Sequence, residues 1–236
     1  MTLTSNDKCP FCGKEYPTIT IPPFAGGRAY TVQSRVCDCD GAVEAERAAA
    51  RKLRQHDLKE AWHKTGVPRI FQPVTPDFDG LGQLEFAGGL YIFGPKGTGK
   101  TTRACSILKA YVSRNQRDGW VSAKFVSVPD WLASMRGNWG HEEEDAFQRA
   151  AGCKLLVLDD LGKGKPTEWA MERLFRLIDR RYNDMRPTIY TSQHGLDQLG
   201  SKCAANGDLE TAEAIVSRIY ATCEAIEYRG ADLRKI

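Results

Sequence analysis

A glycine-rich stretch carries the residue types that bind phosphate. Residues 94–101 read GPKGTGKT, a full match to the phosphate-loop pattern G-x-x-x-x-G-K-[ST]. The glycines let the backbone turn so that its N–H groups face inward, and the helix that follows adds its N-terminal donors. Lys100 would reach the β- and γ-phosphates, and the Thr101 hydroxyl would ligate Mg²⁺. A glycine turn without a ligand is the alternative. The predicted ATP-binding residues are Gly94, Pro95, Lys96, Gly97, Thr98, Gly99, Lys100, Thr101 and Thr102, with Asp159.

Two adjacent carboxylates end an apolar run. Residues 155–162 read LLVLDDLG, so four apolar residues lead directly into Asp159 and Asp160. Two like charges at the end of a buried strand require a positive partner. In phosphate-loop folds a second strand delivers a carboxylate beside the loop to hold Mg²⁺. We expect Asp159 to hold the metal and Asp160 to orient and polarise the attacking water. The alternative is that a carboxylate caps the next loop.

Half of the eight cysteines lie near the start of the chain, as Cys9-x2-Cys12 and Cys37-x-Cys39. A C-x-x-C turn directs both sulfurs to one point, and four thiolates would form a closed tetrahedral Zn²⁺ site. A redox C-x-x-C normally opens a helix after a strand, and the residues before Cys9 are too few for that scaffold. We expect structural zinc, which would contribute much of the folding free energy of this segment. Free thiols are the alternative.

Apolar segments that alternate with helical ones must position these groups. Such alternation favours an α/β fold in which a parallel sheet is covered by helices on both faces. The phosphate loop follows the first strand, which is the context that the motif requires. Strands are expected at 90–93, 123–128, 155–158, 188–192 and 225–228, and helices at 42–64, 102–114 and 168–182.

The composition of the 236 residues is that of a soluble globular protein, with 42% hydrophobic and 27% charged residues. No apolar run approaches the roughly 18 residues of a membrane helix. The first residues lack the pattern of an export signal. We therefore expect a cytoplasmic protein with no membrane partner. The formal net charge of +3 permits a nucleic-acid partner without proving one.

From about residue 66 onward the sequence resembles the DnaC/IstB-like ATPases of the AAA+ superfamily, which include bacterial and phage loaders of the replicative helicase. The most specific part is DDLG, then a helix ending in RRYND, then RPTIYTS. The matching segments are GVPRIF (66–71), GLYIFGPKGTGKTT (89–102), VSVPDWLASMR (126–136), LLVLDDLG (155–162), TEWAMERLFRLIDRRYNDMRPTIYTSQ (167–193) and AIVSRIY (214–220).

The resemblance implies an AAA+ P-loop core with a five-stranded parallel sheet flanked by helices. We expect this ATPase domain to span 66–236, after a small cysteine-rich zinc-binding region at 1–41 and a helical linker at 42–65. Family members complete the ATP site with an arginine from a neighbouring subunit. Arg218 in VSRIY matches that arginine, so we expect self-association through the ATP site.

Two further positions match the family less closely. The γ-phosphate-sensing residue that follows the fourth strand is commonly Asn, whereas this chain has Gln193, whose extra methylene changes its reach. Ser192 is the alternative for that role. Arg234 lies where some relatives place a final arginine, and a solvated terminal charge is the competing interpretation.

The resemblance also implies partners. It indicates an ATP–Mg²⁺-dependent loader that contacts a replicative DNA helicase and single-stranded DNA. Arg136 and Trp139 could contact that DNA. A core position for Trp131, with the acidic run that follows as a helix start, is the competing interpretation of this segment.

Three other functions stay open. An IstB-type transposition helper shares the same core, although the N-terminal cysteines favour a loader. A small-molecule P-loop kinase would need a lid, which the sequence does not show. A DNA- or protein-binding adaptor that does not hydrolyse ATP is favoured only by Gln193.

Overall fold

The computed structural model describes residues 8–16, 18–21, 30–33, 36–135, 141–206 and 208–235. The chain divides into two compact units, Met1–His56 and Asp57–Ile236. The first unit contains the antiparallel strands β1 (Thr18–Ile21) and β2 (Tyr30–Gln33). Helix α1 (Asp40–Lys64) begins slightly before the predicted position, and the boundary between the units falls within it. The predicted three-part division of the chain stays a prediction.

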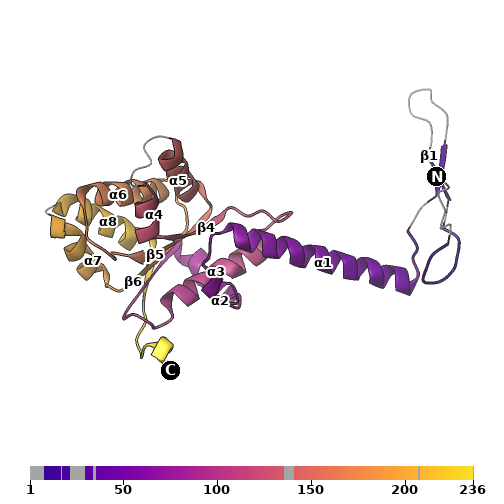
Figure 1. Cartoon of the computed structure of the whole chain (residues 1–236), viewed down its shortest axis with the longest axis horizontal. Coiled ribbons are helices and arrows are strands. Elements are labelled where there is room, and N and C mark those ends of the chain that lie inside the picture. Colours follow the sequence, from indigo (N-terminus) through magenta and orange to yellow (C-terminus); the bar gives the residue numbers. More distant parts are fainter. Residues whose placement is uncertain are drawn as a thin grey trace. The chain divides into compact units, whose positions relative to one another are not determined.

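The second unit is built on a five-stranded sheet in the order β4-β5-β6-β3-β7, in which all neighbouring strands are parallel (Figure 1). This confirms the predicted fold class. Each predicted strand is present, and β5 continues beyond its apolar run through both aspartates. The strands are β3 (Gly89–Phe93), β4 (Ala123–Ser127), β5 (Leu155–Leu161), β6 (Thr188–Ser192) and β7 (Glu224–Glu227).

Helices cover both faces of this sheet. Side-chain caps start three of them, because Asp77, Thr167 and Asp208 each accept a hydrogen bond from a backbone N–H in the first turn of α2, α6 and α8. No described helix is both long and apolar enough to span a bilayer. The helices are α2 (Phe78–Ala87), α3 (Lys100–Asn115), α4 (Val128–Met135), α5 (His141–Gly152), α6 (Glu168–Asn183), α7 (Leu196–Cys203) and α8 (Leu209–Thr222).

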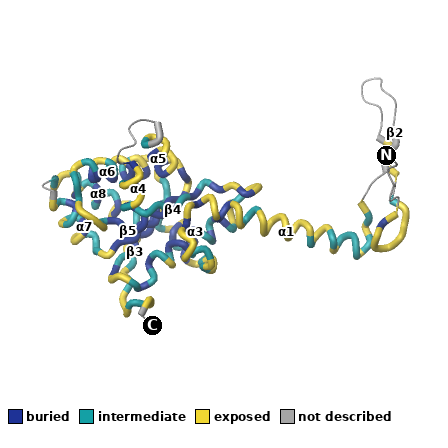
Figure 2. Tube along the Cα trace, viewed as in Figure 1, coloured by how far each residue is buried: buried dark blue, intermediate teal, exposed yellow. Residues whose placement is uncertain are grey.

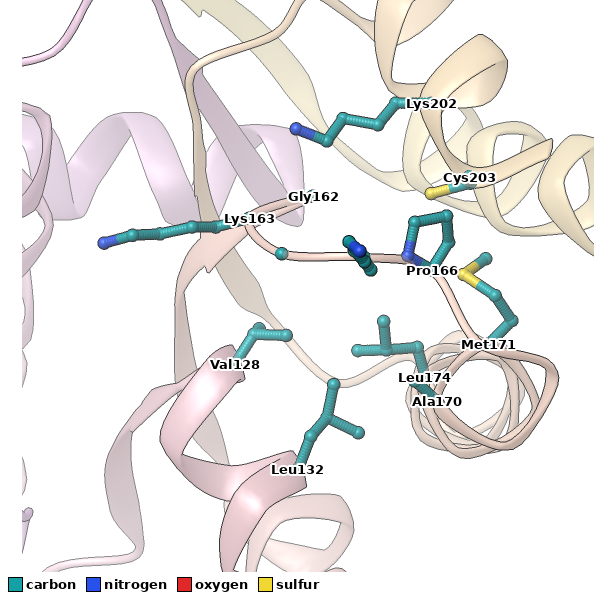
Figure 3. Close-up of a pocket in the computed structure, with 12 residues that line it drawn as sticks. Val128, Leu132, Gly162, Lys163, Pro166, Ala170, Met171, Leu174, Lys202 and Cys203 are labelled. Carbon is teal, nitrogen blue, oxygen red and sulfur yellow. The ribbon is translucent and has the colours of Figure 1, made fainter. Parts of the chain in front are cut away.

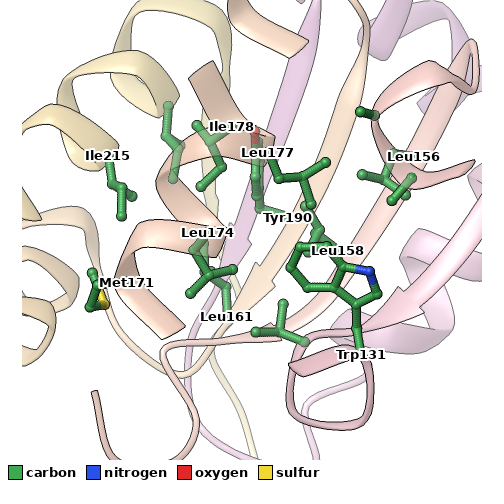
Figure 4. Close-up of a cluster of buried hydrophobic side chains, with 14 of the residues drawn as sticks. Trp131, Leu156, Leu158, Leu161, Met171, Leu174, Leu177, Ile178, Tyr190 and Ile215 are labelled. Atoms are coloured by element: carbon green, nitrogen blue, oxygen red, sulfur yellow. The ribbon is translucent and has the colours of Figure 1, made fainter. Parts of the chain in front are cut away.

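Strand β5 shows why the fold has two cores. Successive side chains of a strand point to opposite faces of the sheet, so a strand buried on both faces is apolar throughout. Leu155 and Val157 pack in the cluster that includes the buried face of α3. Leu156 and Leu158 pack on the other side, against α6 and α8 (Figure 4). Strands β3, β5 and β6 are accordingly buried along nearly all of their length (Figure 2).

Trp131 belongs to the second of these cores, where its side chain is buried beside Leu156 and Leu158 (Figure 4). The core interpretation of Trp131 is therefore confirmed. Arg136 and Trp139, the predicted DNA contacts of the same segment, lie outside the described residues.

A buried arginine explains part of the RRYND signature. Arg181 of α6 is 1% exposed, and its guanidinium donates to Thr188 Oγ1 at 2.8 Å and to the carbonyl of Pro187 at 2.7 Å. It also donates to the carbonyls of Ala150 and Cys153, where α5 ends and β5 approaches. These bonds connect α6 to the segments that lead into β5 and β6, so they fix both strands against the helix.

Candidate functional site

The phosphate loop lies between β3 and α3, and its glycines adopt conformations that other residues avoid. The backbone φ angles are 141° at Gly94, 80° at Gly97 and 90° at Gly99. A Cβ on Gly97 would lie 1.8 Å from the Asp232 carboxylate, and a Cβ on Gly94 would lie 2.0 Å from the Tyr228 carbonyl. The loop therefore needs glycine both for its turns and for the close approach of a second segment.

Lys100 begins α3 and is 8% exposed. Its ammonium donates to the Pro95 carbonyl at 2.6 Å, within the loop itself. Burial lowers the pKa of Lys100, whereas the nearby carboxylates of Asp160 and Asp159 act in the opposite direction. The structure thus brings the predicted cation and both predicted acids into one site.

Asp159 is held by two threonine hydroxyls. Its Oδ1 accepts hydrogen bonds from Thr101 Oγ1 at 2.8 Å and from Thr191 Oγ1 at 2.6 Å. Burial raises the pKa of the Asp159 carboxyl, and the two hydroxyls partly offset that rise. Carboxylate and hydroxyl oxygens are the ligands that Mg²⁺ prefers, so Thr101 and Asp159 fit the predicted metal site. Sequence reasoning missed Thr191, which contacts Asp159 only because β6 lies beside β5.

Asp160 sits on a bulge. The pairing of β5 with β6 shifts between Leu158 and Leu161, and Asp160 has a φ of 59°. Its N–H donates to Thr191 Oγ1 at 3.0 Å, while its carboxylate forms an ion pair of 2.6 Å with Lys163. In a regular strand two successive side chains point to opposite faces. Because of the bulge, the carboxylates of both Asp159 and Asp160 lie near Lys100, where they favour its charged form.

The remaining predicted nucleotide contacts lie as follows. Gln193 follows β6 and is exposed, whereas Ser192 is buried and donates to the Leu161 carbonyl at 2.8 Å. Arg218 lies on α8, where its guanidinium bonds Asp179 of α6 at 2.6 Å. The roles assigned to these residues stay predictions. In the loop itself Pro95, Lys96 and Thr102 are exposed.

The segment after β7 lies against the phosphate loop, and these contacts were not predicted from the sequence. After β7 the Tyr228 N–H donates to the Phe93 carbonyl at 2.6 Å, and the Leu233 N–H donates to the Gly97 carbonyl at 3.0 Å. Arg234 forms an ion pair with Asp232 and adds positive charge near Lys100. An open hollow of about 500 Å³ lies beside this segment and could hold the nucleoside. Its lining is Thr75, Pro76, Asp77, Thr98, Gly99, Thr102, Arg103, Ser106, Tyr228 and Leu233.

The cysteine cluster belongs to the first unit. The sulfurs of Cys9, Cys12, Cys37 and Cys39 all lie within 4.8 Å of one another. The distance is 3.7 Å between Cys9 and Cys39 and 3.6 Å between Cys12 and Cys37. A disulfide would require about 2.05 Å, whereas Zn–S bonds of about 2.3 Å place the sulfurs of a tetrahedron roughly 3.8 Å apart. The cluster could therefore bind zinc. A backbone N–H bond in the Cys9–Cys12 turn lowers the pKa of Cys9 to about 7, which favours the thiolate.

Purified protein should contain one zinc ion per chain by inductively coupled plasma mass spectrometry. A single Cys12→Ser substitution should remove it, because a structural site needs all four thiolates. Cys203→Ser is the matched control, since that cysteine is buried in the second unit and is not part of the cluster. Metal-free wild-type protein with its fold intact would contradict the prediction.

The sheet and this site together define a class. A parallel sheet whose phosphate loop follows β3, and whose acidic pair ends β5 two strands away, is the arrangement of a P-loop ATP-binding protein of the AAA+ type. Within that class, the chain belongs to the family described as IstB-like ATP binding protein, whose model matches residues 44–236.

Two curated relatives have different descriptions. The chain is 23% identical over 167 residues to the replicative helicase loader DnaI of Bacillus subtilis, covering 70% of this chain and 51% of that protein. It thus spans about half the length of that loader. It is 26% identical over 195 residues to an ATP-binding protein of the insertion sequence IS21 from Pseudomonas aeruginosa, covering 80% of this chain and 70% of that protein.

Solved structures support the fold. The crystal structure of DnaI matches with a TM-score of 0.59 at 22% identity, over 71% of this chain and 94% of that one. The crystal structure of the DnaC helicase loader matches with a TM-score of 0.53 at 21% identity, over 69% of this chain and 100% of that one. At this identity the likeness concerns the fold alone.

Proposed function

We propose that the protein is an ATP-hydrolysing loader or remodeller of a hexameric replicative DNA helicase. The observation that carries the proposal is the convergence of Lys100, Thr101, Asp159 and Asp160 on one phosphate loop in a chain of this family. The curated relative DnaI, which is described as a replicative helicase loader, supports the choice of partner.

The residues divide the chemistry between them. Inward-facing N–H groups of the loop and Lys100 would hold the phosphates, while Thr101 and Asp159 would hold Mg²⁺, which neutralises charge on the β- and γ-phosphates. Asp160 would orient the attacking water. Its carboxylate is engaged by Lys163, so turnover would require that ion pair to open.

Arg218 would act on the site of a neighbouring subunit. It projects from α8 and bonds Asp179 of α6, and no described contact joins it to the phosphate loop of its own chain. A guanidinium supplied by a partner stabilises charge on the transferring phosphoryl group. The proposal therefore includes self-association in which the α6–α8 face of one copy meets the ATP site of the next.

The cysteine unit distinguishes the loader from its main competitor. We propose that it forms the contact with the helicase. The IS21 relative favours the second candidate, a transposition helper that would instead act with a transposase. A pull-down from lysate of the source cells with tagged full-length protein, with and without ATP, tests both. Recovery of a hexameric helicase supports the loader, and recovery of a transposase overturns it in favour of the helper.

Single-stranded DNA would bind beside Asp160. The loop after β5 and helix α7 border a small hollow of about 30 Å³ with an apolar floor; Lys163 and Lys202 lie at its rim, and the Lys163 side chain extends away from the floor (Figure 3). The floor includes Leu132, Met171 and Leu174, and Lys165 adds a third cation to the lining. Cations beside an apolar surface suit a nucleic-acid backbone and its bases.

Lys163→Gln should raise ATP turnover without DNA about two- to five-fold, since an exposed ion pair contributes up to roughly 1 kcal/mol and its loss frees the Asp160 carboxylate. The same change should reduce stimulation by oligothymidylate. A coupled ATPase assay with and without oligonucleotide measures both effects.

Lys165→Gln provides the control. It removes a cation from the same hollow, and no ion pair joins Lys165 to Asp160 in the described part of the chain. It should weaken DNA binding and leave turnover without DNA unchanged. If Lys163→Gln instead lowered turnover, the ion pair would be supporting catalysis and the inhibitory role would be wrong.

A further inference from the structure

A second hollow lies at the opposite end of the sheet from the phosphate loop. It is open and measures about 510 Å³. The chain segments that form it lead into the N-terminal ends of β4 and β5, whereas the phosphate loop follows the C-terminal end of β3. All of it belongs to the second unit. Its lining is Lys64, Trp120, Val121, Ser122, Ala123, Lys124, Gln148, Arg149, Gly152 and Cys153.

Trp120 presents a large aromatic surface to this hollow. The side chain is 64% exposed, whereas the apolar lining residues Val121, Ala123 and Cys153 are buried. The turn that carries it is well ordered by hydrogen bonds, because Arg117 and Trp120 exchange both backbone N–H bonds, at 2.8 and 2.9 Å. Gly119 within the turn has a φ of 70° and accepts a bond from Lys64. The backbone that carries the indole is therefore held in place, and the ring is accessible.

The lining of the hollow is positively charged. Among the described residues, it includes Lys64, Lys124 and Arg149 and no carboxylate. The Lys64 ammonium donates to the Gly119 carbonyl at 3.0 Å, and the Lys124 ammonium donates to the Lys64 carbonyl at 2.6 Å. A carboxylate would neutralise these ammonium groups. The backbone carbonyls that accept their hydrogen bonds carry no net charge and only orient them. An anion entering the hollow would meet the three cations of its lining.

We propose that this hollow binds single-stranded nucleic acid. A base can stack on the exposed ring of Trp120 while Lys64, Lys124 and Arg149 contact the adjoining phosphates. In a duplex the base faces are already stacked, so the indole would contribute nothing. An acidic peptide would form ion pairs with the cations but would make no stacking contact with the indole. This site is separate from the lysine hollow beside Asp160 and does not depend on the proposed loader function.

The experiment uses full-length Lys100→Ala protein without ATP or helicase, so its outcome does not depend on nucleotide turnover. Binding of fluorescein-labelled oligothymidylate is followed by anisotropy at several salt concentrations. Trp120→Ala should weaken binding roughly ten-fold, since stacking on one aromatic ring is worth about 1–3 kcal/mol per base. Trp120→Phe should restore most of the affinity. Lys124→Gln and Arg149→Gln should each reduce the salt slope by about one.

Two further measurements complete the test. Ultraviolet crosslinking of an oligonucleotide that carries 5-iododeoxyuridine should label the peptide containing Trp120. Arg69→Gln, which removes an exposed cation outside the hollow, should change nothing. Unchanged affinity for Trp120→Ala, or label confined to other peptides, would overturn the proposal. Binding of polyglutamate but not of oligothymidylate would overturn it in favour of an acidic protein partner.

Discussion

Lys100→Ala should weaken ATP binding on the order of 100-fold, because hydrogen bonds to charged groups contribute about 1.5–3 kcal/mol each and 1.4 kcal/mol is a factor of about ten. The Lys100 side chain is buried in the loop, where its ammonium donates a hydrogen bond to the Pro95 carbonyl. The nearby carboxylates of Asp160 and Asp159 favour its charged form. Titration with a fluorescent ATP analogue measures the affinity directly.

The control for this prediction lies in the same loop. Lys96 also carries a positive charge there, but its side chain is exposed and its position in the pattern is variable. Lys96→Ala should therefore change the affinity far less than Lys100→Ala. Equal losses would mean that the loop attracts the nucleotide by net charge alone. An unchanged melting temperature for both variants would exclude unfolding as the cause.

The parts of the site that are local in sequence could be predicted. GPKGTGKT contains its own turn residues, cation and hydroxyl, and LLVLDDLG contains both the buried strand and its acids. The apolar runs of β3 and β5 could also be predicted to form strands, because a strand buried on both faces of a sheet is apolar almost throughout. These features need no knowledge of which elements become neighbours.

Other parts depend on neighbours that are distant in sequence. Thr191 reaches Asp159 because β6 is inserted between β5 and β3, an order that no local pattern states. The approach of Asp232 to Gly97 likewise follows from the pairing of β7 with β3 at the sheet edge. The bulge at Asp160 appears only when the register of β5 against β6 is known. The sequence predicted that both acids follow the apolar run of β5, but it did not indicate which residues hold them.

The second large effect is expected at Arg218. Replacing it by Ala should leave ATP binding intact and reduce turnover about a thousand-fold, the range found for arginines supplied by a partner. The guanidinium also has contacts within its own chain, since it bonds Asp179 at 2.6 Å and lies 4.8 Å from the ring of Phe175. Asp179→Asn removes the same ion pair and keeps the arginine. If the loss came from the α6–α8 contact, both variants would lose turnover; a finger role predicts that Asp179→Asn stays active.

Mixing two inactive variants decides whether Arg218 acts between subunits. The Arg218→Ala protein retains an intact phosphate loop, and the Lys100→Ala protein retains an intact arginine. Where the two meet in the proposed orientation, one interface has both groups and should hydrolyse ATP. Turnover should therefore reappear on mixing and should rise with protein concentration, because the active site exists only in the assembly. If the mixture were as inactive as its components, Arg218 would have no role in the ATP site of a neighbouring subunit. The proposed self-association through that site would then no longer be supported by a catalytic arginine.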